Sequence, residues 1–179
     1  MISRGFWTEA EYWALGETNS RIELIDGHLA VSPSADNAHQ EIAYRLKHAL
    51  EPAAAAAHLR VPLTPNLYLG PGRLVIPDLA VGRYPRSATR NAAEDTVVVI
   101  EVTSPSNAAT DQMRLYAEAG IPWYLLLEPD FPDYESLTVH LLRLDGGHYI
   151  EHAVAKDGEV LSSDEPFALS LDIDDLLNF

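Results

Sequence analysis

Two acidic residues stand where an apolar strand is expected. Asp78 follows Leu74-Val75-Ile76-Pro77 at the end of one apolar segment, and Glu101 lies inside the β-branched run 96–102. A carboxylate there is costly unless it is paired, hydrogen-bonded or bound to a metal. Two acids on neighbouring strands can share a hard cation such as Mg²⁺, which activates water and stabilises charge on a phosphate. The alternative, that Glu101 faces solvent and Asp78 caps a turn, is equally compatible with the residues alone.

Glu23 and His39 are two further candidates. Strand alternation places Glu23 on the face opposite Ile22 and Leu24, where it is either a third acid of the site or an exposed carboxylate. His39 begins a long predicted helix and either contacts phosphate or a carboxylate, or is simply solvated. There is no HExxH spacing, no G-x-S-x-G elbow and no Walker loop. Zinc, serine-hydrolase and P-loop chemistry are therefore not expected.

The charge is unevenly distributed along the chain. The net charge of −15 argues against a nucleic-acid partner, because phosphate attraction needs Lys and Arg. Between positions 52 and 91, however, Asp78 is the only acid, and the residues after 118 carry most of the negative charge. The central third is thus locally basic and supplies candidate contacts to a DNA backbone. Its arginines are Arg60, Arg73, Arg83, Arg86 and Arg90.

Composition and patterning predict one domain over residues 1–179 in a reducing, cytoplasmic setting. The chain has no cysteine, the start lacks the apolar run of a signal peptide, and no segment is long enough to span a membrane.

The elements that must position these residues follow from local patterns. A capping box at Thr8 predicts a short helix, and Asp26-Gly27 between alternating segments predicts a β-hairpin. A helix is expected from Asp36 to about Ala57, kinked or divided at Pro52. Further segments are predicted as strands at 59–69, 74–76, 96–102 and 123–127, a helix from the Ser104–Asn107 cap to Ala119, strands at 137–144, 148–154 and near 160, and a helix at 171–177.

The resulting fold class is α/β. The strand–helix–strand unit from 97 to 127 predicts a parallel pair. We expect a mixed β-sheet core flanked by helices, with an N-terminal β-hairpin and a β-rich C-terminal extension.

Several motifs occur together and in order: Arg-Ile-Glu-Leu-Ile-Asp-Gly at 21–27, Ile-Pro-Asp at 76–78, Val-Ile-Glu-Val-Thr-Ser-Pro-Ser at 99–106, and Leu-Tyr-Ala-Glu-Ala-Gly-Ile-Pro-Trp-Tyr at 115–124. Over roughly residues 8–144 the chain resembles the Uma-two family, which is placed with restriction endonucleases in the PD-(D/E)XK superfamily. The resemblance implies that the mixed β-sheet core is restriction-endonuclease-like. The resemblance implies that Asp78 and Glu101 bind Mg²⁺, with Mn²⁺ as a substitute. It also implies that Glu23 is the early acid near the metal and that His39 is the histidine at the head of the long helix.

The lysine typical of this superfamily is missing. Thr103 stands at the simple E-x-K position, and only Lys47 and Lys156 occur in the chain. Gln112 or Arg114 on the next predicted helix could take its place, although Gln112 carries no charge and Arg114 cannot act as a base. Loss of one preorganised electrostatic group costs on the order of 100- to 1000-fold in rate.

The sequence therefore supports a Mg²⁺-dependent endonuclease acting on DNA, with Asp78, Glu101, Glu23, Gln112 and Arg114 as catalytic candidates. His39, Arg73, Arg83 and Arg86 are the candidate DNA contacts. The alternative is a weak or inactive nuclease-fold protein that binds nucleic acid or regulates a partner. A third interpretation is an interaction protein that uses the fold as a scaffold, with Trp123 and Tyr124 either in a homodimer surface or in the core.

Overall fold

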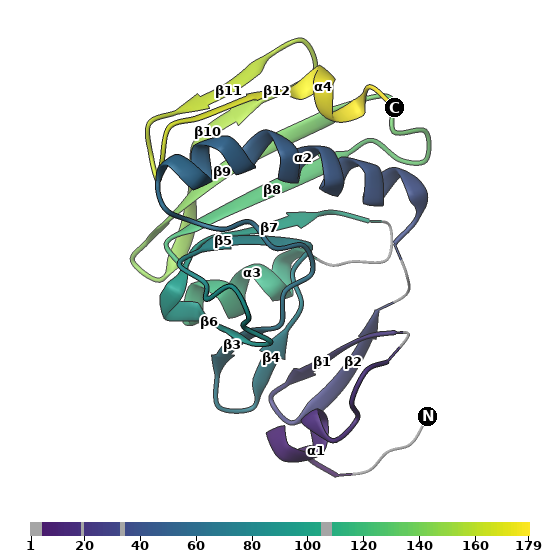
Figure 1. Cartoon of the computed structure of the whole chain (residues 1–179). Coiled ribbons are helices and arrows are strands. Elements are labelled where there is room, and N and C mark those ends of the chain that lie inside the picture. Colours follow the sequence, from purple (N-terminus) through teal and green to yellow (C-terminus); the bar gives the residue numbers. More distant parts are fainter. Residues whose placement is uncertain (1–4, 19, 33–34, 105–108) are drawn as a thin grey trace.

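The computed structural model describes residues 5–18, 20–32, 35–104 and 109–179. Within these ranges the strands form two five-stranded sheets and one two-stranded sheet, with helices packed on them (Figure 1). The mixed α/β class predicted from the sequence is confirmed. None of the helices in the described ranges is long and apolar enough to cross a membrane.

The first sheet is built around the predicted N-terminal hairpin. Asp26 and Gly27 both have positive φ, as the tight turn between its two strands requires. A helix of one turn precedes it, capped reciprocally by Thr8 and Glu11. The order in the sheet is β2-β1-β4-β3-β6. Its elements are α1 (Glu9–Trp13), β1 (Arg21–Ile25), β2 (His28–Ser32), β3 (Leu67–Gly70), β4 (Arg73–Val75) and β6 (Asn91–Ala92).

The second sheet has the order β10-β9-β8-β7-β5. Strands β7 and β8 are parallel, as predicted, and α3 lies between them in the chain; the other neighbours pair antiparallel. The elements are β5 (Leu79–Gly82), the 3-10 turn η1 (Ala93–Asp95), β7 (Thr96–Val102), α3 (Ala109–Glu118), β8 (Trp123–Pro129), β9 (Leu137–Asp145) and β10 (His148–Ala155).

Alternation along β7 divides its side chains between two cores. Val98 and Ile100 pack in one core with Leu46 and Leu50 of α2 (Asn37–Ala56), the long helix that crosses the sheet in Figure 1. Val99 packs in the other core, with α3. Glu101 therefore shares the side of Val99. The α2 core is completed by β11 (Val160–Ser163), β12 (Leu169–Asp172) and α4 (Ile173–Leu177).

The structure departs from the sequence prediction in several segments. The predicted strand over 59–69 is a strand only from Leu67, because Pro62 and Pro65 interrupt it and leave isolated bridges at Arg60 and Leu63. Asp78 does not end a strand; it lies between the end of β4 and the start of β5. Pro52 does not divide α2, which runs as one helix.

Two further details concern the ends of predicted elements. The cap predicted at 104–107 falls mostly outside the described residues, and α3 is described from Ala109. The C-terminal helix begins at Ile173, because the preceding residues form β12. Trp123 and Tyr124 are buried, which supports their reading as core residues.

Candidate active site

The site lies where the chain passes from the first sheet to the second. Residues 76–78 connect β4 to β5. In the second sheet Leu79 pairs with Ile100, so Asp78 and Glu101 are the next facing positions. In the first sheet β1 pairs with β4, and the backbone N–H of Ile76 donates to Glu23 Oε1 at 2.7 Å. This crossing brings Glu23, Asp78 and Glu101 together.

All three carboxylates are buried. The exposed fractions are 2 % for Glu23, 4 % for Asp78 and 2 % for Glu101. The alternatives in which Glu101 faces solvent and Glu23 is an exposed strand residue are therefore wrong. Carboxylates this deep need compensating partners, because their burial without partners is very unfavourable.

Arg21 supplies the positive charge among these acids. Its Nη1 lies 2.8 Å from Asp78 Oδ1, and its Nη2 lies 3.7 Å from Glu101 Oε2 and 3.9 Å from Glu23 Oε1. Its Nε and Nη2 are buried and make no hydrogen bond within the described part of the chain. The sequence prediction missed Arg21, although strand alternation placed it on the same face of β1 as Glu23.

Other groups occupy the remaining oxygens of the acid pair. Asp78 Oδ2 accepts a 2.8 Å hydrogen bond from the N–H of Val102 and lies 3.2 Å from His39 Nε2. The hydroxyl of Tyr116 donates to Glu101 Oε1 at 2.6 Å. Asp78 Oδ1 and Glu101 Oε2 are thereby left facing the guanidinium of Arg21, with the N–H of Asp78 at 3.4 Å from the latter oxygen.

Two helices position these outer partners. Asp36 caps α2 by accepting a hydrogen bond from the N–H of His39 at 2.8 Å, and the hydroxyl of Tyr134 donates to the same carboxylate. The cap holds the first turn of α2, from which His39 reaches Asp78. Tyr116 reaches Glu101 from α3 and is fully buried. His39 therefore orients a carboxylate, which was one of the two roles considered for it.

The environment separates the pKa values of the two paired acids. Burial raises the pKa of Asp78, but His39, Arg21 and the Val102 amide outweigh it, so the pKa lies below its usual range. Burial and the neighbouring Asp78 charge raise the pKa of Glu101 well above its usual range, despite Arg21 and Tyr116. Burial also raises the pKa of Glu23, against the effect of Arg21. Asp78 is thus the group that stays ionised most readily.

The two candidates for the missing lysine differ in placement. Gln112 is buried, lies one helical turn from Tyr116 on the same side of α3, and its Oε1 has no hydrogen-bond partner in the described ranges. Arg114 is mostly exposed, and its guanidinium pairs with Glu118 at 2.5 Å. Among the described contacts Arg114 makes no ion pair with the three acids, so the structure does not bring it to the site.

The three arginines predicted to contact DNA, Arg73, Arg83 and Arg86, lie in different surroundings, and none of them is part of the acid cluster. Arg73 is held by Asp26 and Glu118, both at 2.6 Å, and forms an internal bridge between the hairpin turn, β4 and α3. Arg83 and Arg86 are exposed and make no ion pair with any described acid. None of these three contacts Glu23, Asp78 or Glu101.

The arrangement of oxygens fits a cation with few protein ligands. Among the described residues no group of three or more His, Cys, Asp or Glu side chains is arranged to hold a metal. Asp78 Oδ1 and Glu101 Oε2 nevertheless converge on one positive charge, and Mg²⁺ commonly takes one or two carboxylates with waters and phosphate oxygens. A metal at this point would require the guanidinium of Arg21 to move aside.

Comparison with known proteins identifies the family and the fold. Residues 7–174 match the model of the Uma2 family, whose description is "Putative restriction endonuclease". The fold is similar to a crystal structure described as a putative nuclease belonging to DUF820 from Anabaena variabilis. The TM-score is 0.73 at 23% sequence identity, covering 96% of this chain and 97% of the other. No curated protein matches the chain.

Proposed function

This chain belongs to the Uma2 family, and on that premise we propose that it is a Mg²⁺-dependent endonuclease that hydrolyses DNA phosphodiester bonds. One observation supports the proposal: Asp78 Oδ1 and Glu101 Oε2, two oxygens of a buried acid cluster, both face the guanidinium of Arg21. Such a pair would hold Mg²⁺, or Mn²⁺ in its place. The bound cation would activate a water and neutralise charge on the scissile phosphate.

The surrounding residues would keep the two ligand oxygens in position. His39 and the Val102 amide hold Asp78 by its other oxygen, and Tyr116 does the same for Glu101. Hydrogen bonds of this kind fix the orientation and basicity of metal-binding carboxylates. Glu23 has one oxygen on the Ile76 amide, and its raised pKa favours uptake of a proton released by the attacking water.

Arg21 would supply the charge that the missing lysine supplies elsewhere in the superfamily. Of the two lysines, Lys47 pairs with Glu51 on α2 and Lys156 is exposed. Arg21 is already among the acids, and a modest movement of its long side chain would let it contact a phosphate oxygen instead. Its pKa is raised by Glu101, Asp78 and Glu23 against the effect of burial, so it stays charged and cannot act as a base.

Cleavage of DNA tests the proposal. Supercoiled plasmid and end-labelled duplex are incubated with Mg²⁺ or Mn²⁺ and with wild type, Asp78→Asn or Glu101→Gln. We expect metal-dependent cleavage by wild type and a loss on the order of 100-fold or more in each variant. Asp26→Asn is the matched control, because Asp26 is an exposed acid whose partner is Arg73. Equal cleavage by wild type and Asp78→Asn would overturn the proposal.

The position of Arg21 also favours a second candidate function. A guanidinium that already neutralises the three acids would suit a nuclease-fold protein that binds nucleic acid or a partner without cutting. In that case DNA binding would be measurable and unchanged by Asp78→Asn, and no metal-dependent cleavage would be found. Cleavage that disappears in Asp78→Asn would exclude this second function.

A further inference from the structure

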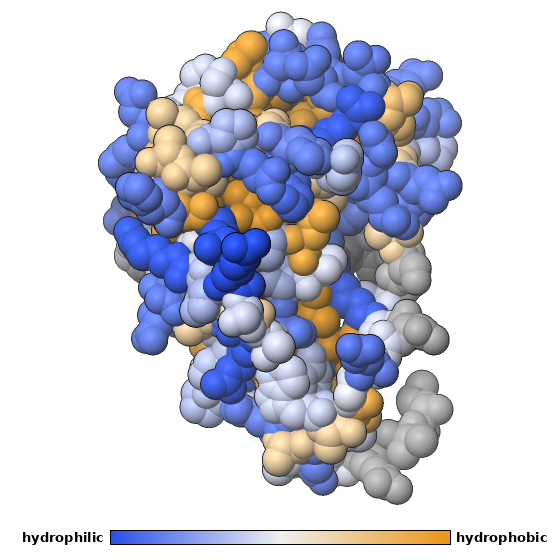
Figure 2. Space-filling model, in the orientation of Figure 1, coloured by the Kyte–Doolittle hydropathy of each residue, from blue (hydrophilic) through white to orange (hydrophobic). Residues whose placement is uncertain are grey.

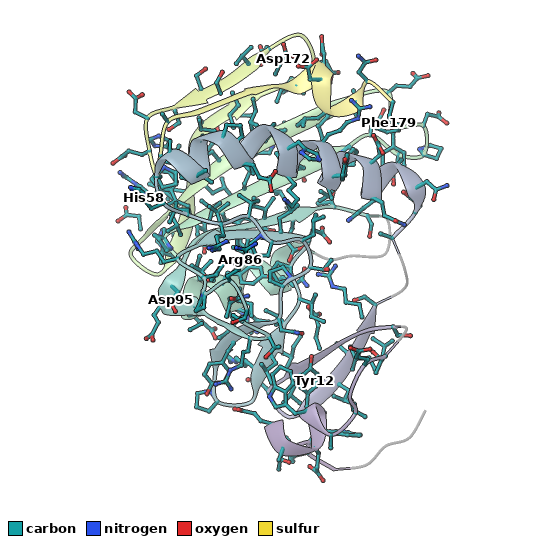
Figure 3. The ribbon with its side chains drawn as sticks, viewed as in Figure 1. Tyr12, His58, Arg86, Asp95, Asp172 and Phe179 are labelled. Carbon is teal, nitrogen blue, oxygen red and sulfur yellow. The ribbon has the colours of Figure 1, made fainter. Side chains whose placement is uncertain are left out.

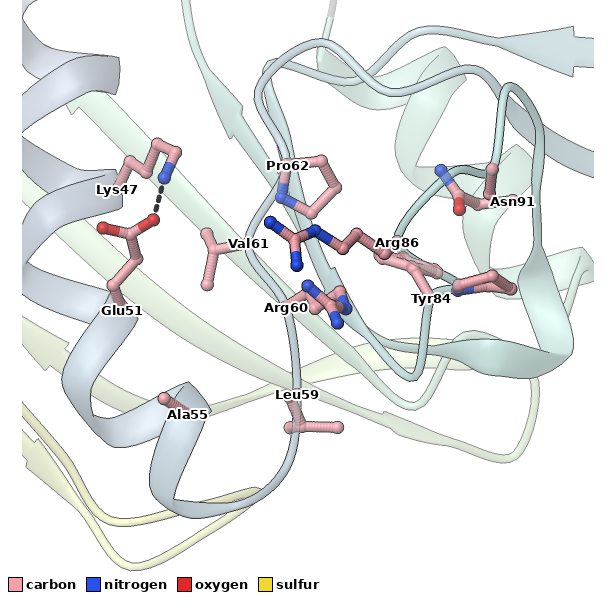
Figure 4. A pocket seen from close by; sticks show the side chains of 12 residues that line it. Lys47, Glu51, Ala55, Leu59, Arg60, Val61, Pro62, Tyr84, Arg86 and Asn91 are labelled. Atoms are coloured by element: carbon pink, nitrogen blue, oxygen red, sulfur yellow. Dashed lines mark hydrogen bonds and ion pairs between the residues drawn. The ribbon is translucent and has the colours of Figure 1, made fainter.

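A cavity lined partly by polar side chains lies beside α2, and none of the three acids lines it. Its volume is about 470 Å³, which is within the range of small-ligand sites. The side chains that matter for its chemistry are Lys47 and Glu51 of α2, Arg60 of the segment after α2, and Tyr84, Arg86 and Asn91 of the segment between β5 and η1. Figure 4 shows the side chains of Arg60 and Arg86 among the residues that line it.

The charges of this cavity are not balanced. Lys47 is paired with Glu51, as the dashed line in Figure 4 shows. In the described part of the chain the guanidinium groups of Arg60 and Arg86 make no hydrogen bond and no ion pair. Both side chains are exposed to solvent, and they stay unpaired in a chain with 27 acidic residues and 12 basic ones. The surface is strongly hydrophilic in Figure 2 where Figure 3 labels Arg86. The cavity therefore favours an anion.

Asn91 adds a second, independent feature. It is buried, with 7 % of its surface exposed, and its Oδ1 has no hydrogen-bond partner within the described ranges. An orphaned buried acceptor is unfavourable, and a rotation of the Asn91 side chain toward the cavity would let a ligand N–H or O–H satisfy it. The ligand should thus carry a hydrogen-bond donor as well as an anionic group.

The wall of the cavity is firmly built. The hydroxyl of Tyr84 donates to Thr96 Oγ1 at 2.8 Å, and the Thr96 hydroxyl donates to the carbonyl of Ala92. The Tyr84 ring lies so close to Gly82 that a Cβ there would come within 2.5 Å of it. The backbone of Arg60 is bound to Gly82 in both directions. Arg60 therefore extends from a backbone held against β5, and Arg86 follows the fixed ring of Tyr84 by two residues.

We propose that this cavity binds a nucleotide unit of a DNA strand, with its phosphate on Arg60 and Arg86 and a base or sugar donor on Asn91. Guanidinium groups suit phosphate, and Asn91 Oδ1 suits an amino or hydroxyl group. The inference rests on the proposed function for its choice of nucleic acid. Along α2, His39 and Glu51 are separated by about 18 Å, the rise of roughly five nucleotides of one B-form strand. The cavity would hold the strand at that distance from the scissile phosphate.

Binding is measured by fluorescence anisotropy with labelled oligonucleotides of three to twelve nucleotides, without metal, on the Asp78→Asn protein. The test variant is Arg60→Gln/Arg86→Gln. Its matched control is Arg45→Gln/Arg73→Gln, which changes the net charge equally but removes arginines paired with Glu41, Asp26 and Glu118. We expect at least tenfold weaker binding of the longer oligonucleotides by the test variant, and a salt-dependence slope reduced by about 1–2. Equal losses in the two double variants would overturn the proposal.

Two further arms identify the source of the phosphate and the role of Asn91. Competition by a deoxynucleoside monophosphate and by inorganic phosphate shows whether the pocket also takes free nucleotides. We expect the monophosphate to compete better than inorganic phosphate, and Asn91→Ala to remove that difference. Equal competition by both, unchanged in Asn91→Ala, would overturn nucleotide recognition and leave only a general anion site. Since no cleavage is involved, a failed nuclease assay and a failed binding assay remain separate results.

Discussion

At the residue scale, the site is a cluster of three buried carboxylates with one guanidinium at its centre. Asp78 is stabilised as an anion by His39, Arg21 and a backbone amide, whereas Glu101 is held in an unfavourable setting by burial and by the charge of Asp78. The fold keeps this unfavourable arrangement buried, with 4 % or less of each acid exposed. Such costs are typical of sites maintained for chemistry or binding.

The two acids should therefore affect stability in opposite directions. Ionised Glu101 lowers stability above its unfolded pKa of about 4.3, because its folded pKa is raised. Asp78 contributes stability above its unfolded pKa of about 3.9, and that contribution is lost as the pH falls through its lower folded value. At pH 7 we expect Glu101→Gln to raise Tm by about 2–4 °C and Asp78→Asn to lower it. Calorimetric scans from pH 7 to pH 4 should show the gain of Glu101→Gln disappearing; a lower Tm for Glu101→Gln at pH 7 would contradict this.

Removal of Arg21 should show whether its guanidinium and a divalent cation compete for the same position beside the acids. Arg21→Ala leaves the acids without their cation, which costs about 3–5 kcal/mol when a buried pair loses one partner. A divalent cation would then take the vacant position, so Mg²⁺ or Mn²⁺ should raise Tm more in Arg21→Ala than in wild type. Arg21→Lys, which keeps the charge without the planar fork, gives a second reading if the alanine variant folds poorly. An equal metal-induced shift in Arg21→Ala and Arg21→Ala/Asp78→Asn would show that the metal binds elsewhere.

At the element scale, the site depends on how the chain passes between sheets. The crossing at residues 76–78 sets Asp78 opposite Glu101, and the β1–β4 pairing brings in Glu23 with Arg21. The N-terminus of α2 and the inward side of α3 add His39 and Tyr116. Each of these elements is short or carries its site residue near one end. A substitution at such an end should therefore displace one side chain of the site without unfolding the hydrophobic cores.

The cap of α2 offers such a local disturbance. Asp36→Ala removes the acceptor for the His39 N–H and is expected to cost about 1 kcal/mol, or about 2–4 °C in Tm. It should also lower any metal-dependent cleavage by about tenfold, because His39 loses its fixed position against Asp78. Asp36→Asn keeps the capping geometry and serves as the control. If both variants lose stability and rate equally, the charge or the Tyr134 contact is responsible, and the capping account is wrong.

The sequence predicted the elements that depend on local pattern. The Asp26-Gly27 hairpin, the α2 amphipathic helix and the β7–α3–β8 unit are confirmed. The short strands β5 and β6 were missed, since each is brief and is defined by its partner rather than by its own pattern. Glu23, Asp78 and Glu101 were singled out from residue type and setting. Arg21 was not, although alternation places it on the same face of β1 as Glu23; its contacts with Asp78 and Glu101 depend on the crossing between the two sheets.

At the scale of the whole molecule, the net negative charge limits how the proposed nuclease could bind DNA. Arg73 already forms ion pairs with Asp26 and Glu118, and the Arg90 guanidinium lies 4.9 Å from the centre of the Tyr68 ring. Arg60, Arg83 and Arg86 are the remaining arginines of the central segment, and none of the three makes an ion pair in the described structure. Few phosphate contacts are therefore expected from a chain of net charge −15.

The salt dependence of duplex binding should reflect this small number. With about three phosphate contacts, the slope of log affinity against log salt should be near −2 to −3 for the Asp78→Asn protein without metal. Arg73→Gln should leave the slope unchanged, whereas Arg83→Gln should reduce its magnitude by about 1. A slope steeper than about −6 would mean that a larger basic surface, formed by other residues or by association of chains, contacts the DNA.

We propose that Asp78 and Glu101 share one divalent cation at the position taken by the Arg21 guanidinium. Crystals soaked in Mn²⁺ and measured for anomalous scattering test it most directly, because they locate the ion and Arg21 together. We predict a peak within coordination distance of Asp78 Oδ1 and Glu101 Oε2, a displaced Arg21, and no peak in Asp78→Asn crystals. A guanidinium that stays in place, with no peak between the two carboxylates at saturating Mn²⁺, would contradict the claim.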